Sequence, residues 1–141
     1  MGLKLTIKPN DRVILNGSIL RNAGSQRMVI EIENRSDVLR GDEIMTEPDA
    51  TTPVRRLCHL TQVALASPEN RDRAVTSAIN ILNDLADIMG DSQSLALSEV
   101  RRHITDENFY AAFKGLAPVL EHEARLLKLT PHRRPPEGAV A

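Results

Sequence analysis

The chain has 141 residues, of which 41% are apolar and 26% are charged, enough to form one ordinary domain or two small halves that share a core. Lys and Arg total 18 and Asp and Glu total 19, and this formal net charge of -1 excludes a strongly cationic protein that wraps nucleic acid. The aromatic residues are Phe109, Tyr110 and Phe113, too few for a surface on which several bases stack.

The first third of the sequence has the period of β-strands. Apolar and polar residues alternate from Leu3 to Lys8, and further short strands are predicted over residues 12–15, 18–21, 27–33 and 38–39. Asn16-Gly17 stands between the second and third of these and is typical of a tight type I′ hairpin turn. We therefore expect a small antiparallel β-meander or a barrel-like arrangement of four or five strands.

From Thr52 onward the apolar residues follow the period of a helix. Thr52-Pro53 predicts a helix to about Ser67, with Thr as the N-cap and Pro in the first turn, and Ser67-Pro68-Glu69 repeats this start signal. The next helix spans residues 71–89, carries two adjacent apolar stripes and ends at Gly90. A third helix is expected over residues 92–103 and a fourth after Asn108, which Pro118 should kink or divide.

These patterns predict an α+β protein. An antiparallel β region over residues 1–50 precedes a bundle of three to five helices over residues 51–129. The Pro-rich residues 130–141 are expected to form a disordered tail. The sequence has no long apolar run and no signal-peptide pattern, so we expect a cytoplasmic protein without a membrane span.

Signals for catalysis and for metal or cofactor binding are weak throughout. The four histidines, at positions 59, 103, 122 and 132, lack the spacing of metal ligands, and no glycine-rich phosphate loop or nucleophile elbow is present. Cys58 excludes a disulfide within the chain because it is the single cysteine. Its position four residues after Val54 predicts a buried core thiol, and its cationic neighbours leave a reactive thiolate as the alternative. We expect no enzyme activity, no metal and no cofactor.

Arginines are the most informative charged residues. Several lie near predicted turns or strand ends, where guanidinium groups on a small sheet can bind phosphates and base edges. The candidate RNA-binding residues are Arg12, Arg21, Arg27, Arg40, Arg55 and Arg56, with Lys4 and Lys8 as phosphate-directed charges. The alternative is that the arginines of the β region are solvated charges paired with Glu31, Glu33, Asp37, Asp42 and Glu43.

Arg55 and Arg56 stand in the first turn of a predicted helix, where a cation opposes the helix dipole. Each misplaced charge costs a few tenths of a kcal/mol, roughly, at an exposed site. Their position suggests an acidic residue elsewhere in the chain, or a bound anion, as a partner.

Several segments together resemble the FlbT family of flagellum biosynthesis repressors. The resemblance rests on Leu3-Lys4-Leu5-Thr6-Ile7-Lys8-Pro9, Val13-Ile14-Leu15-Asn16-Gly17, Val38-Leu39-Arg40, Asp42-Glu43-Ile44-Met45 and Ala50-Thr51-Thr52-Pro53-Val54-Arg55-Arg56. It implies a post-transcriptional regulator that binds the 5′ untranslated region of flagellin mRNA, lowers its translation or stability, and works alongside a FlaF-like partner. The family carries no established catalytic residues to transfer to this chain.

Two interpretations follow from the residues and the resemblance. In the first, the protein binds the flagellin mRNA leader through the candidate RNA-binding arginines and lysines named above. In the second, it is a protein-interaction module that binds flagellin or a FlaF-like protein through the broad apolar stripes of residues 71–89 and affects mRNA indirectly. The same stripes are also consistent with a homo-oligomer.

Overall fold

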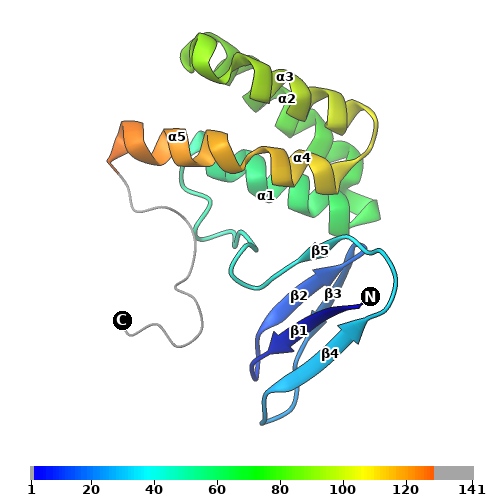
Figure 1. The fold of residues 1–141 in the computed structure, drawn as a ribbon. Coiled ribbons are helices and arrows are strands. Elements are labelled where there is room, and N and C mark those ends of the chain that lie inside the picture. Colours follow the sequence, from blue (N-terminus) through cyan, green and yellow to red (C-terminus); the bar gives the residue numbers. More distant parts are fainter. Residues whose placement is uncertain (1, 129–141) are drawn as a thin grey trace. The chain divides into compact units, whose positions relative to one another are not determined.

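In the computed structural model, which describes residues 2–128, five strands are followed by five α-helices (Figure 1). The predicted α+β class is confirmed. The described residues divide into a β unit, residues 2–44, and a helical unit, residues 45–128. The predicted disordered tail, residues 130–141, lies outside the described residues.

The β unit contains two small antiparallel sheets. In one sheet β1 (Leu3–Ile7) pairs with β4 (Met28–Ile32); in the other, β2 (Arg12–Leu15) lies between β3 (Ser18–Arg21) and β5 (Val38–Leu39). The first and fourth strands are paired, so the chain does not form the sequential meander that its turns allow. The five strands instead form two separate sheets, one of two strands and one of three.

Strand alternation places one apolar face of each sheet in a shared core. The buried core side chains are those of Leu5, Ile7, Val13 and Val38, with Leu15, Ile30 and Ile32 packed against them. The φ angles of Asn16 and Gly17 are 50° and 86°, as a type I′ turn requires, so the predicted hairpin is confirmed. The Asp37 N–H donates to Asn16 Oδ1 at 2.8 Å, and this bond holds the residue that precedes β5 against the turn.

The helical unit contains α1 (Pro53–Ala66), a 3-10 turn (Pro68–Asn70), α2 (Arg71–Ile88), α3 (Asp91–Thr105), α4 (Phe109–Gly115) and α5 (Ala117–Leu127). α1 packs against α2 and α4, and α3 packs against α4. Their shared interior is apolar and includes Val54, Leu57, Leu82, Leu85, Val100, Leu116 and Val119, each no more than 2% exposed. Among the described residues, no helix is both long and apolar enough to cross a bilayer.

Local signals account for most helix ends. Thr52 caps α1 by accepting from the Arg55 N–H at 3.2 Å, and Pro118 stands in the first turn of α5 and separates it from α4. Gly90 follows α2 with φ 75°. The expected α-helix start at Ser67 instead gives one 3-10 turn, because the Ser67 hydroxyl is bonded to the side chains of Glu69 and Asn70 and caps no backbone N–H.

Candidate nucleic-acid interface

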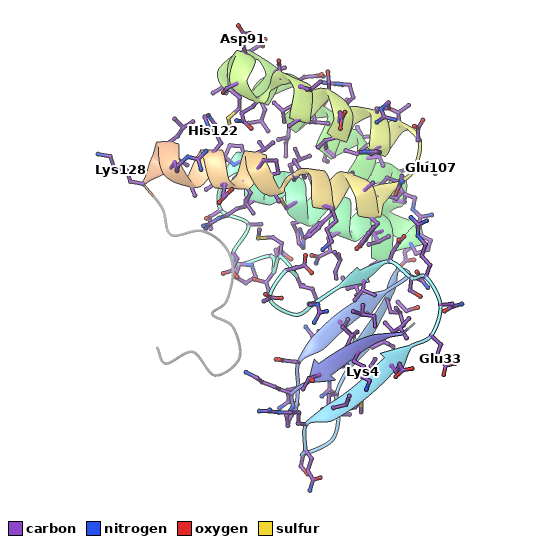
Figure 2. All side chains as sticks on the ribbon, viewed as in Figure 1. Lys4, Glu33, Asp91, Glu107, His122 and Lys128 are labelled. Atoms are coloured by element: carbon purple, nitrogen blue, oxygen red, sulfur yellow. The ribbon has the colours of Figure 1, made fainter. Side chains whose placement is uncertain are left out.

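Four cationic residues lie at one end of the β unit. β1 and β3 finish there and β2 and β4 begin there, as the register pairs Ile7↔Met28 and Arg12↔Arg21 show. The basic loop end is defined by Lys8, Arg12, Arg21 and Arg27. Within residues 8–12 and 21–27 the one acidic side chain is Asp11, so this end has a local charge of +3. Figure 2 shows Glu33 at the other end of the unit, beyond β4.

Asn22 holds the two loops of this end together. Its amide group donates to Ile7 O at 2.9 Å and to Gln26 O at 2.8 Å, and its Oδ1 accepts from the Gly24 N–H at 3.0 Å. Backbone bonds from Asn10 N to Asn22 O and from Asn22 N to Asp11 O complete the connection. Asn22 is 2% exposed, and both donors and the oxygen of its side-chain amide take part in bonds that fix the loops that carry the cations.

Arg12 and Arg21 lie directly opposite each other on β2 and β3, and both are exposed. Opposite residues of an antiparallel pair have Cβ atoms about 5 Å apart, and like charges at this separation repel each other. A guanidinium nitrogen of Arg21 donates to Asn10 Oδ1 at 3.2 Å, which orients the group. An anion placed between the two guanidinium groups would relieve their repulsion.

The other four predicted contacts lie elsewhere. Lys4 is exposed in β1 and faces Glu31 across the β1–β4 pair. Arg40 follows β5 in a turn closed by Glu43, whose carboxylate accepts from the Arg40 N–H at 3.1 Å. Arg55 and Arg56 belong to the first turn of α1, in the helical unit. The structure therefore gathers half of the predicted set at one place.

A buried acidic residue, Glu123, binds the start of α1, the helix whose first turn carries Arg55 and Arg56. This residue of α5 is 4% exposed, accepts from the Val54 N–H at 3.0 Å and accepts from the Thr52 hydroxyl. A carboxylate at the N-terminus of α1 compensates the helix dipole that the two arginines oppose. Sequence reasoning missed Glu123, although its position four residues after the buried Val119 was a usable signal.

Cys58 is a core thiol. It is 3% exposed, and burial raises the pKa of its thiol from 9.0 to about 12, with a further increase from the nearby Glu123 carboxylate. Arg55 acts in the opposite direction and is outweighed. The reactive-thiolate alternative is therefore wrong. Within residues 2–128, no three His, Cys, Asp or Glu side chains are grouped as metal ligands.

These features define a two-part α+β protein that presents a rigid cationic loop end and whose buried ionisable groups, Glu123 and Cys58, support the fold. The model of the family described as flagellar protein FlbT matches residues 3–127. The chain belongs to the FlbT family.

Curated relatives carry names that describe regulation. A probable flagellum biosynthesis repressor protein FlbT from Caulobacter sp. (strain K31) is 27% identical over 90% of this chain and 97% of its own. A protein of the same name from Mesorhizobium japonicum is 28% identical over 89% of this chain and 84% of its own. The flagellum biosynthesis repressor protein FlbT of Caulobacter vibrioides (strain ATCC 19089) is 25% identical over 87% of both chains. No solved structure matches this chain.

Proposed function

We propose that this protein represses flagellin expression after transcription by binding the 5′ untranslated region of flagellin mRNA through its basic loop end. The observation that carries the proposal is the convergence of Lys8, Arg12, Arg21 and Arg27 on loops that Asn22 holds together. Membership of a family whose curated members are named flagellum biosynthesis repressors supports the biological role. The proposal places the protein in the cytoplasm, where the mRNA is translated.

The chemistry of the loop end favours phosphates and base edges over stacked bases. The aromatic residues of the chain all lie in α4, outside the β unit, so a base-stacking surface on the strands is absent from the described residues. Arginine can bind RNA without such a surface, because its planar guanidinium group can bind a phosphate with two parallel hydrogen bonds or reach the edge of an unpaired base. Unpaired loops and leaders expose both groups.

Four phosphate contacts set the expected salt dependence. Each contact to a single strand contributes about 0.7 to the slope of log affinity against log salt, so four contribute about 2.8. Affinity should then fall roughly 50-fold between 50 and 200 mM salt. This dependence is modest, as expected for a protein with a net charge near zero.

The test is a gel-shift titration of the full chain with a flagellin leader RNA at several salt concentrations. The double variant Arg12→Gln and Arg21→Gln should weaken binding and reduce the slope by about 1.4. Arg35→Gln is the matched control, because Arg35 is an exposed arginine of the same unit after β4, at the other end. Arg35→Gln should lower the affinity and the slope by less than the double variant does.

Absence of binding by the pure protein at low salt would overturn the proposal. Equal losses from the Arg35 control and from the double variant would overturn the assignment of the loop end. If the pure protein does not bind RNA, the alternative interpretation replaces the proposal. In that interpretation the protein contacts flagellin or a FlaF-like protein, and mRNA levels change indirectly.

A further inference from the structure

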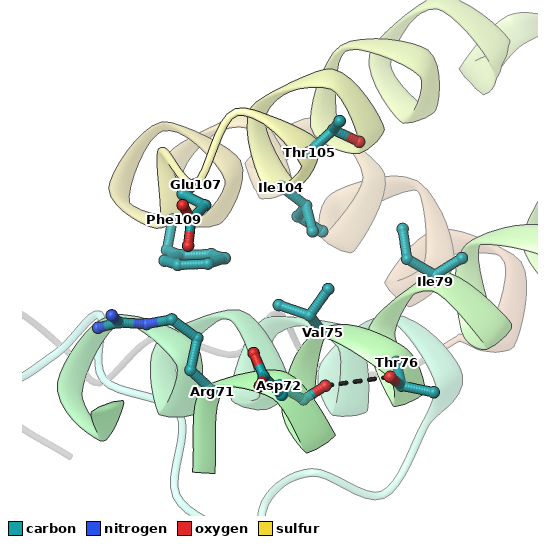
Figure 3. A pocket seen from close by; sticks show the side chains of 9 residues that line it. All are labelled: Arg71, Asp72, Val75, Thr76, Ile79, Ile104, Thr105, Glu107 and Phe109. Carbon is teal, nitrogen blue, oxygen red and sulfur yellow. Dashed lines mark hydrogen bonds between the residues drawn. The ribbon is translucent and has the colours of Figure 1, made fainter. Parts of the chain in front are cut away.

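A groove runs across the helical unit between α2 and the turn that joins α3 to α4 (Figure 3). Its volume is about 430 Å³, within the range of sites that hold a small ligand or a few side chains. The side chains of Val75, Ile79, Ile104 and Phe109 project into the gap from both sides. The proposed RNA-binding role does not use this groove.

Two carboxylates lie at the rim of the groove, beside these apolar side chains. Asp72 belongs to the first turn of α2 and Glu107 to the α3–α4 turn, and both are exposed. Within residues 2–128, neither side chain has a hydrogen-bond or ion-pair partner. Arg71, the cation of the groove, is already engaged: its Nε donates to Ala64 O at 2.8 Å, and its guanidinium carbon lies 5.5 Å from the centre of the Phe109 ring.

The backbone fixes Glu107 at the rim. Its φ angle is 59°, a left-handed conformation that costs a non-glycine residue about 1 kcal/mol or more. The turn is held by bonds from Glu107 N to Ile104 O at 3.0 Å and from Asn108 N to His103 O at 2.8 Å. The carboxylate is therefore attached to a defined point beside Phe109, and not to a freely moving loop.

We propose that this groove docks a segment of a partner protein that carries a leucine-sized apolar side chain next to a lysine or arginine. The apolar side chain would lie among Val75, Ile104 and Phe109, and the cation would face Asp72 and Glu107. The charged lining residues are Arg71, Asp72 and Glu107, and the helical unit as a whole is also acidic, with twelve acidic and nine basic side chains in residues 45–128. An acidic rim repels phosphates, so this surface and the basic loop end differ in the partner that they select.

A pair of alanine-based helical peptides tests this inference. Both carry leucines four residues apart; one has lysines beside them and the other has glutamates at the same positions. Titration of the isotopically labelled full chain by NMR should move the signals of Val75, Ile79 and Ile104 with the lysine peptide. The lysine peptide should bind roughly fivefold or more tightly than the glutamate peptide.

Two variants locate the site. Asp72→Asn combined with Glu107→Gln should abolish the preference for lysine, while both residues keep their size and the fold is unchanged. Leu95→Ser is the matched control, since Leu95 is 74% exposed on α3 outside the groove, and this change should leave binding as it is. Equal affinity for the two peptides, or shifts that depend on Leu95, would overturn the proposal. Neither result bears on RNA binding, which is measured with different variants.

Discussion

Glu123 offers the sharpest test of how the helical unit is held together. Its two carboxylate oxygens bind the Val54 N–H and the Thr52 hydroxyl, and all three residues are buried. Replacement by alanine leaves both donors without an acceptor at a site that water does not reach. Each buried donor that loses its partner costs about 1–3 kcal/mol, so Glu123→Ala, which leaves two such donors, should lower the free energy of unfolding by about 2–6 kcal/mol.

Glutamine at the same position separates the hydrogen bonds from the charge. Its amide oxygen can still accept from the Val54 N–H, but the favourable interaction of a carboxylate with the start of α1 is lost. Glu123→Gln should therefore cost about 1–2 kcal/mol, less than alanine. Glu121→Ala is the control, because Glu121 is exposed on the same helix and its removal should change stability by less than about 0.5 kcal/mol.

The assay is urea unfolding followed by fluorescence of Tyr110, which is the single tyrosine of a chain without tryptophan and belongs to α4. The signal therefore reports on the helical unit. A Glu123→Ala variant as stable as the Glu121→Ala control would refute the reasoning, since it would mean that the start of α1 finds other acceptors. Equal losses for glutamine and alanine would refute the separation of hydrogen bonding from charge.

Three further outcomes are expected. Because the pKa of Cys58 is raised from 9.0 to about 12 in the folded chain, the thiol of the unfolded chain loses its proton at a lower pH. The stability of the protein relative to the Cys58→Ala variant should therefore fall above pH 9, by up to about 1.4 kcal/mol per pH unit. Urea unfolding on both sides of pH 9 measures this difference. Asn22→Ala should destabilise the β unit by about 2–4 kcal/mol and weaken RNA binding, and thermal unfolding by circular dichroism together with the gel shift would expose a failure of either. Gly17→Ala should cost about 1 kcal/mol because φ is 86°, and an unchanged melting temperature would contradict this.

Features set by neighbours in the sequence were predictable. The Asn16-Gly17 turn, the Thr52 cap of α1 and the division at Pro118 each depend on the conformational preferences of one or two residues. The α+β class followed from the change of period near residue 50. These predictions needed no knowledge of what lies beside each element in space.

Features set by distant residues were not predictable in the same way. The pairing of β1 with β4 joins strands about twenty residues apart, and turn chemistry does not choose between such partners. Asn22 resembles any turn residue in the sequence until its five hydrogen bonds within and between the two loops are seen, and Glu123 resembles a surface carboxylate of α5. Of the eight predicted RNA contacts, antiparallel pairing selected the four that share an end, and whether these bind RNA stays a prediction.

The break between α4 and α5 at Pro118 also fixes the number of residues between this proline and Glu123. α5 begins at Ala117 with Pro118 in its first turn, and Glu123, five positions after this proline, must point toward α1. Successive side chains on an α-helix are rotated by about 100°, so one inserted or deleted residue between these two positions would swing the carboxylate away from the helix that it caps. Natural variation in chain length should therefore be absent from this short stretch.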